Sequence, residues 1–195
     1  MSREQFLTIW SLISPGCLIL IGSFLLMGQF TWYPAFPDLR VSLVIYSVYW
    51  ILVSGLQSLL LRRVQEPSLA VKWFWTTAIT GLSLMLAHDL LLLDILGINT
   101  GGQGILLLII SLPALAISGG LVLGFTQFRL IRNLHPNHQR NRQLRPNWFL
   151  ASWVSWGLSF LCLFFGGYGA PLTLIFLALI GTTLKGIFLA KYLRL

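Results

Sequence analysis

Charge is what this sequence has least of. Only 9% of its 195 residues are Asp, Glu, Lys or Arg, whereas 56% are hydrophobic. A typical soluble domain carries about 25% charged residues. The chain therefore has too little polar surface to cover a water-soluble globule, and its composition predicts a membrane protein.

Acidic residues are the scarcest of the charged types, and their scarcity limits the chemistry that the chain can perform. No two of them lie at a spacing that would form a carboxylate dyad. A nucleophile elbow and a His-Glu-x-x-His helix are also absent. We therefore expect no catalytic residues, no metal site and no enzymatic activity, and we expect no nucleic-acid partner. The five acidic residues are Glu4, Asp38, Glu66, Asp89 and Asp94.

Cysteine is nearly absent as well. The two that occur, Cys17 and Cys162, both fall inside long apolar runs. A cysteine in such a run usually packs as a small buried hydrophobe. The cysteines therefore do not predict a disulfide framework.

Long apolar runs, in contrast, fill most of the chain. A helix needs roughly 20 apolar residues to cross a hydrocarbon core of about 30 Å. Six runs are this long or nearly so, which predicts an all-α integral membrane bundle of six transmembrane helices forming a single domain over residues 1–195. The predicted spans are 6–28, 40–61, 73–96, 104–129, 149–166 and 171–191.

The basic residues indicate how these spans are threaded. If six spans alternate in direction, twelve of the thirteen Lys and Arg residues lie on one face, and Arg40 is the exception. The positive-inside rule makes that face cytoplasmic, with both termini on it. Five arginines lie in the connector between the fourth and fifth spans, where we expect them to contact anionic lipid headgroups or a partner subunit. They are Arg129, Arg132, Arg140, Arg142 and Arg145.

The chain also contains an internal repeat. Aligning Gln57 with Gln127 places Arg62 on Arg132, and a second alignment that places Arg132 on Arg194 also places Gly124 on Gly186. The odd-numbered spans resemble one another too, since residues 73–86 and 148–163 both begin with tryptophan and contain Gly-Leu-Ser. The pattern predicts three helical hairpins in tandem, covering about 6–63, 73–132 and 148–194.

The helix end formed by Gly124, Gln127 and Arg132, followed by a polar loop and the Trp-rich "SWGLSF" helix, resembles small multi-pass membrane proteins common in cyanobacteria. The likeness covers about the last two hairpins. In the first hairpin the glycine is one place off, at Gly55, and in the third Leu189 replaces the glutamine. The resemblance implies a protein of the bacterial plasma membrane or the thylakoid, without implying a reaction.

Small residues mark faces where helices can approach closely. Ala116, Gly120 and Gly124 recur every fourth residue on the fourth span, with Gln127 on the same face. On the third span Gly81 shares a stripe with His88, and Gly55 occupies the related place on the second. Such stripes let two backbones come together. The partner could be a helix of this chain or of another protein, and we favour packing within the chain.

Three polar side chains lie near the cytoplasmic ends of spans. Gln57 and Gln127 could line a small polar cavity, but we favour hydrogen bonds between helices. Lys185 is close enough to the membrane surface to extend its ammonium group there, and we assign it that role.

The histidines are the only candidate ligands. His88, beside Asp89, could bind a metal or the magnesium of a pigment, or could relay protons. The simpler interpretation, which we favour, makes both residues polar groups near the outer interface. His135 and His138 have a His-x-x-His spacing, but Pro136 opposes a helix there and a zinc site is not expected. No cofactor is identified, and chlorophyll and carotenoid stay open.

Two functions fit these features. The leading hypothesis is a non-catalytic accessory subunit or assembly factor that packs against other membrane proteins, such as those of photosynthesis. The alternative is a small-solute transporter or substrate-binding membrane component, which would need convergent polar groups around a midplane cavity.

Overall fold

Six helices form the part of the chain that the structure, a computed structural model, describes. This part comprises residues 1–27, 39–97, 102–132, 138–155 and 170–193, and it contains no strand. The helices are α1 (Arg3–Met27), α2 (Leu39–Arg62), α3 (Pro67–Gly97), α4 (Gly102–Arg132), α5 (His138–Trp153) and α7 (Ala170–Leu193). The prediction of an all-helical chain is confirmed.

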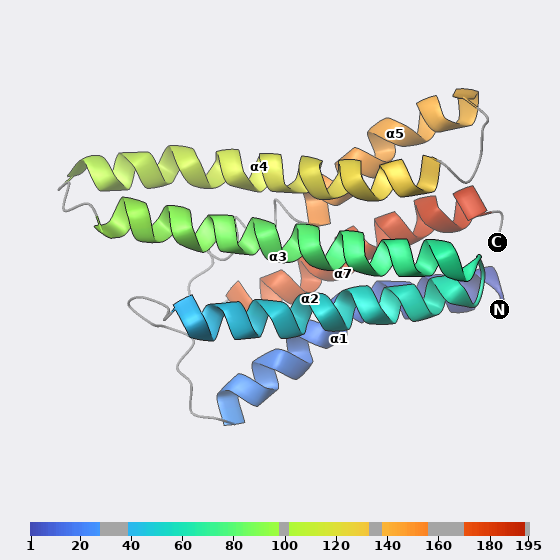
Figure 1. The fold of residues 1–195 in the computed structure, drawn as a ribbon, viewed down its shortest axis with the longest axis horizontal. Helices are drawn as coiled ribbons and strands as arrows, with labels where there is room; N and C mark the ends of the chain where they lie inside the picture. Colours follow the sequence, from blue (N-terminus) through green and yellow to red (C-terminus); the bar gives the residue numbers. More distant parts are fainter. Residues whose placement is uncertain (28–38, 98–101, 133–137, 156–169, 194–195) are drawn as a thin grey trace.

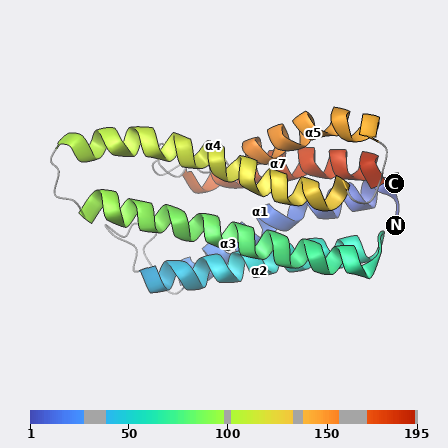
Figure 2. The same cartoon turned by 45° about the horizontal axis from the view of Figure 1, so that its top comes forward.

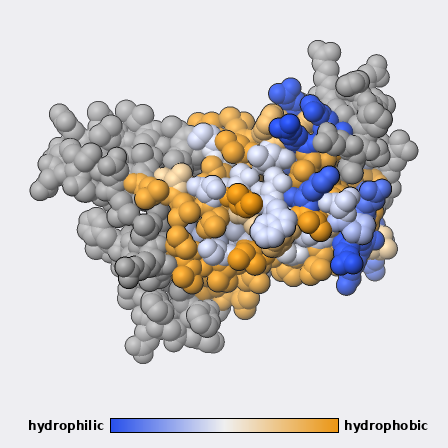
Figure 3. All heavy atoms as spheres, in the orientation of Figure 1, coloured by the Kyte–Doolittle hydropathy of each residue, from blue (hydrophilic) through white to orange (hydrophobic). Residues whose placement is uncertain are grey.

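Four of these helices are long and apolar enough to cross a membrane, as judged by length and composition within the described residues. Their outward surfaces carry large apolar side chains that are more than half exposed, among them Leu20, Leu59 and Phe176. A soluble protein seldom displays so broad an apolar surface. The middle of the face shown in Figure 3 is mostly apolar, as expected for a surface that contacts lipid. The four segments are Arg3–Ile21, Leu43–Arg62, Pro67–Ala87 and Ile175–Leu193.

The helices pack as a closed ring. Each neighbour in the chain order α1, α2, α3, α4, α5 and α7 packs against the next, and α7 returns to pack against α1 (Figures 1 and 2). One end of this ring gathers the start of α1, the turn between α2 and α3, the end of α4, the start of α5 and the end of α7. We call it the basic end, because the hydrophilic side chains gather there (Figure 3).

Local hydrogen bonds fix the helix starts at the basic end. Ser2 and Gln5 form a capping box at the start of α1, because the Gln5 amide donates to the Ser2 hydroxyl and the Ser2 amide donates to the Gln5 side chain. This exchange satisfies two amides that lack partners in the first turn of a helix. At α3, Pro67 is the first helical residue, a position that needs no amide hydrogen, and the Leu69 amide donates to the Glu66 carbonyl.

The start of α5 corrects one expectation. The polar segment 138–148 was expected to be part of a cytoplasmic loop, with the fifth span beginning near 149. It is helical from His138, and Pro146 lies inside the helix. Residues 138–148 therefore belong to a helix and not to a loop. Arg140, Arg142 and Arg145 lie on this helix, which packs against α4 and α7.

The core lies towards the basic end. Its largest fully buried side chains include Phe6, Trp10, Trp73 and Tyr192, contributed by α1, α3 and α7. Hydroxyl groups add hydrogen bonds between helices around it. Ser14 and Tyr49 pair across α1 and α2 at 2.6 Å, and the Ser58 hydroxyl on α2 donates to a carbonyl of α3 at 2.6 Å. Such bonds contribute roughly 1 kcal/mol each in a membrane.

Candidate functional site

A buried lysine is the most unusual polar residue of the core. Lys185 lies on α7 inside a candidate membrane span, and only 6% of its surface is exposed. Its ammonium group donates to the Gln127 side-chain carbonyl on α4 at 3.2 Å, and it lies 6.0 Å from the Trp148 ring centre on α5. That separation is at the outer limit of a cation–π contact. Lys185 therefore connects three helices inside the ring.

This position overturns the expectation that Lys185 extends to the membrane surface. Its side chain points into the bundle because α7 closes the ring against α1 and α5. An ionised side chain in such a place is costly and is a functional-site candidate by default. Lys185 is thus the centre of the candidate site rather than an interfacial anchor.

Gln127 extends the hydrogen bonding from Lys185 to α3. Its amide nitrogen donates to the Thr77 hydroxyl at 3.1 Å, while its carbonyl accepts from Lys185. Gln127 and Thr77 are 3% and 1% exposed, so water does not share these bonds. The result is a buried chain of hydrogen bonds from α7 through α4 to α3.

A second polar pair lies across α2 and α3. The Trp73 indole donates to the Gln57 side-chain carbonyl at 3.0 Å, and both residues are buried. Gln57 and Gln127 thus both form hydrogen bonds with residues of α3, and Gln127 also accepts one from Lys185 on α7. Together these two networks form what we call the polar layer, consisting of Gln57, Trp73, Thr77, Gln127 and Lys185.

Tryptophans fill the space beside the polar layer. They are Trp10 on α1, Trp73 on α3 and Trp148 on α5, and Trp73 lies between the other two. Its ring centre is 5.7 Å from that of Trp10 and 6.2 Å from that of Trp148, in edge-to-face arrangements. Phe6 stacks on Trp10 at 5.5 Å. At this level the interior of the ring is occupied by aromatic side chains, and these packed rings restrict the positions of the polar groups.

The internal repeat shows how exceptional Lys185 is. When the helix ends are aligned as above, Val53 on α2 and Leu123 on α4 occupy the position equivalent to Lys185 on α7. All three side chains are buried, at 3%, 4% and 6% exposure. The repeat therefore has an aliphatic residue at this buried position in two hairpins and a lysine in the third. Comparing the copies at this position is the sequence signal that could have identified Lys185.

The polar layer and its surroundings offer more hydrogen-bond donors than acceptors. An ammonium group carries three N–H bonds, and one of them is accounted for by Gln127. Within the described residues, the indole N–H groups of Trp10 and Trp148, which can only donate, are buried without a protein partner. The two carboxylates whose side chains are described, Glu4 and Glu66, are exposed. An acceptor or an anion would therefore complete the layer.

The glycine stripe on α4 packs within the chain. A Cβ at Gly120 would lie 2.9 Å from the Trp153 Cα, and one at Gly124 would lie 2.9 Å from the Ser152 Cβ, both on α5. Such distances require the absence of a side chain. The close approach therefore joins α4 to α5, as favoured from the sequence, rather than to another protein.

The other two glycines differ from each other. A Cβ at Gly81 would overlap the Trp50 indole, so α2 and α3 depend on its absence. A Cβ at Gly55 would make an ordinary contact with Phe74 at 3.9 Å. Gly55 therefore does not require its small size, which fits its offset position in the repeat.

Several predicted residues lie outside what the structure describes. His88, Asp89 and Ala116 belong to described helices, but their side chains are not described, and the same holds for His138. Cys162 and His135 lie outside the described residues. Among the described side chains, no group of three or more His, Cys, Asp or Glu residues could hold a metal ion.

Comparisons with protein-family models, with curated proteins and with solved structures find no match to this chain. The site must therefore be interpreted from its own geometry.

Proposed function

We propose that the protein is a non-catalytic subunit or assembly factor of a larger membrane complex. In this proposal it crosses the membrane six times as three hairpins, with the basic end and both termini in the cytoplasm. The last turns of α2, α4 and α7, which lie at the basic end, carry Arg62, Arg129, Arg132 and Lys191. This supports the orientation, because cytoplasmic segments carry an excess of Lys and Arg.

The filled interior is the observation that carries the proposal. Trp10, Trp73 and Trp148 occupy the ring at the level of the polar layer, where a solute pathway would have to pass. Two grooves on the described part of the chain, one between α4 and α5 and one beside the start of α1, are lined by neither Lys185 nor Gln127. A packed scaffold with an apolar exterior suits a protein that acts by contacting other membrane proteins.

Gentle solubilisation followed by sizing tests this proposal. The tagged full chain, extracted from its native membrane in a mild detergent, should migrate with stoichiometric companion subunits well above its own 21.9 kDa. The resemblance to cyanobacterial proteins directs the search to thylakoid and plasma membranes, where the absorption spectrum would also reveal bound chlorophyll or carotenoid. Recovery of the chain only as a free monomer, with no companion after cross-linking in the membrane, would overturn the proposal.

Lys185 favours a second candidate, a membrane component that binds a small anionic solute. The buried ammonium group and the surplus of donors around it lack a described anionic partner. A carboxylate, a phosphate or a halide would supply the missing acceptor. Binding would require the tryptophans to move, because they pack against this layer.

A thermal-shift and uptake screen with a panel of small anions distinguishes the two candidates. If the second is right, one anion class should stabilise the wild type and the Lys185→Arg variant but not Lys185→Gln. Lys72→Gln, which removes an exposed cation from α3, is the matched control and should respond like the wild type. An identical response of Lys185→Gln and Lys72→Gln to every anion would eliminate this candidate.

A further inference from the structure

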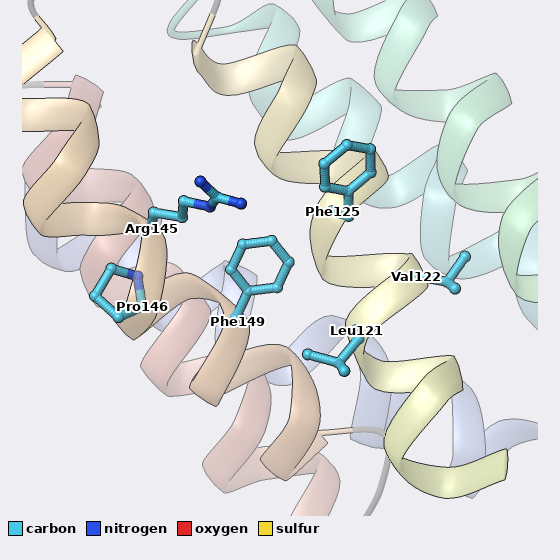
Figure 4. Close-up of a pocket in the computed structure, with 6 residues that line it drawn as sticks. All are labelled: Leu121, Val122, Phe125, Arg145, Pro146 and Phe149. Carbon is cyan, nitrogen blue, oxygen red and sulfur yellow. The ribbon is translucent and has the colours of Figure 1, made fainter. Parts of the chain in front are cut away.

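A groove on the outside of the ring lies between α4 and α5. Its volume is about 600 Å³, which is within the range of small-molecule sites, roughly 300–1,000 Å³. Three of its α4 residues are exposed to between 44% and 51%, so the groove opens towards the surroundings of the bundle. It is lined by Leu121, Val122, Phe125, Arg145, Pro146 and Phe149 (Figure 4).

The polarity of this groove changes along its length. The chain of α4 runs towards the basic end and that of α5 runs away from it. Arg145 is consequently the lining residue of α5 nearest the basic end, and Phe149 follows one turn deeper. Leu121 is the α4 lining residue farthest from that end, and Phe125 is one turn closer. The groove therefore has a cation at its mouth and apolar side chains along its floor.

Arg145 is the only charged residue among those that line the groove. Its guanidinium carbon lies 5.8 Å from the centre of the Phe149 ring, so the side chain extends over the groove (Figure 4). The described carboxylates, Glu4 and Glu66, belong to the starts of α1 and α3 rather than to α4 or α5. The positive charge at the groove mouth thus has no described carboxylate partner.

We propose that this groove binds one anionic phospholipid, with its phosphate on Arg145 and an acyl chain along Phe149, Phe125 and Leu121. A lipid matches both properties of the groove, because it joins an anion to a long apolar chain. Anionic headgroups lie at the level where basic residues border a membrane span. This inference rests on the part of the proposed function that places α4 and α5 in the membrane, and it does not depend on the proposed role as a subunit.

Native mass spectrometry of the full chain in detergent tests the proposal. The delipidated protein is titrated with phosphatidylglycerol and, separately, with phosphatidylcholine of identical acyl chains. The wild type should retain one phosphatidylglycerol under conditions that remove phosphatidylcholine. Arg145→Gln should weaken phosphatidylglycerol binding about fivefold, as expected for the loss of one arginine at a membrane surface, and Arg145→Lys should preserve most of it.

Two further variants separate the site from general charge and from misfolding. Arg132→Gln removes an exposed arginine from the end of α4 that does not line the groove, and it should bind phosphatidylglycerol like the wild type. Leu121→Trp fills the groove without changing charge and should weaken both lipids. Equal retention of the two lipids by the wild type, or equal losses in Arg145→Gln and Arg132→Gln, would overturn the proposal. So would a dimer, or a complex with another protein, that Leu121→Trp dissociates.

Discussion

The helices α2 and α4 carry equivalent glutamines at the same depth of the bundle, yet the two glutamines have different tasks. Gln57 on α2 forms one neutral hydrogen bond, with the Trp73 indole. Gln127 on α4 joins a hydroxyl and a buried ammonium group. The neighbouring glycines also differ. A Cβ at Gly124 would lie too close to Ser152 on α5, whereas a Cβ at Gly55 would make an ordinary contact. The repeat thus places a glutamine at equivalent positions of α2 and α4. Lys185 of the third hairpin contacts only the one on α4, which makes the surroundings of Gln127 chemically distinct.

The glycines should give the largest difference between the two helices. Gly124→Leu would force α4 away from Ser152 and Phe149, and overpacking of this kind typically costs about 1–3 kcal/mol. Gly55→Leu should cost less, because a Cβ there would make an ordinary contact with Phe74 at 3.9 Å. Thermal unfolding in detergent, monitored by tryptophan fluorescence, measures both variants. Equal destabilisation would show that the glycines are equivalent after all.

Replacing the glutamines should give a difference of comparable size. Gln127→Leu removes the partners of both Lys185 and Thr77, so a buried ammonium group loses its described acceptor. An unsatisfied buried group costs about 1–3 kcal/mol, and more if it is charged. Gln57→Leu leaves one indole N–H without its acceptor and should cost about 1 kcal/mol. Urea or heat unfolding of the two purified variants compares these costs, and a Gln57 variant that is the less stable would contradict the assignment.

A double-mutant cycle isolates the part of this difference due to Lys185. Lys185→Leu restores the aliphatic residue found in the other two hairpins, so the cost of Gln127→Leu should fall in its presence. We expect a coupling of about 1 kcal/mol between positions 127 and 185. The pair 57 and 185, for which no contact is described, should show none. Independent effects at 127 and 185 would mean that their 3.2 Å contact contributes nothing to stability.

The smallest effect should distinguish two of the tryptophans. Trp73→Phe removes the donor to Gln57, whereas Trp148→Phe removes an indole N–H that has no described protein partner. Both variants lose similar aromatic volume, so Trp73→Phe should cost more by the value of one hydrogen bond, roughly 0.5–1.5 kcal/mol. The unfolding midpoints of the two variants provide the measurement. A larger cost for Trp148→Phe would point to a partner that its N–H acquires in the membrane.

The sequence predicted where the helices begin and end better than it predicted which of their side chains point into the bundle. Apolar runs predicted α1 at 6–28 and α2 at 40–61, close to the observed Arg3–Met27 and Leu39–Arg62, because helix length follows directly from the apolar stretch. The polar start of α5 was missed because residues 138–148 lack an apolar run and contain Pro146. The helix packs against α4 and α7, and composition does not reveal such contacts.

Lys185 was misplaced for a related reason. It lies two turns before the end of α7, about 12 Å at 1.5 Å per residue, which is near enough to the helix end for a lysine to reach the surface if it points outward. The low amphipathicity of an apolar span does not reveal which face points inward. The contact between α7 and α1 decides that, and it depends on residues more than 170 positions apart, such as the Thr182 hydroxyl and the Ser11 carbonyl at 2.9 Å.

The seam between α1 and α7 has a consequence for biogenesis. A ribosome makes α1 before α7, so Trp10 lacks its contact with Gly186 until α7 has been synthesised. During that interval the nascent bundle is an open arc with an uncovered aromatic edge. An insertase or chaperone that shields this edge would have to leave before α7 can pack against α1.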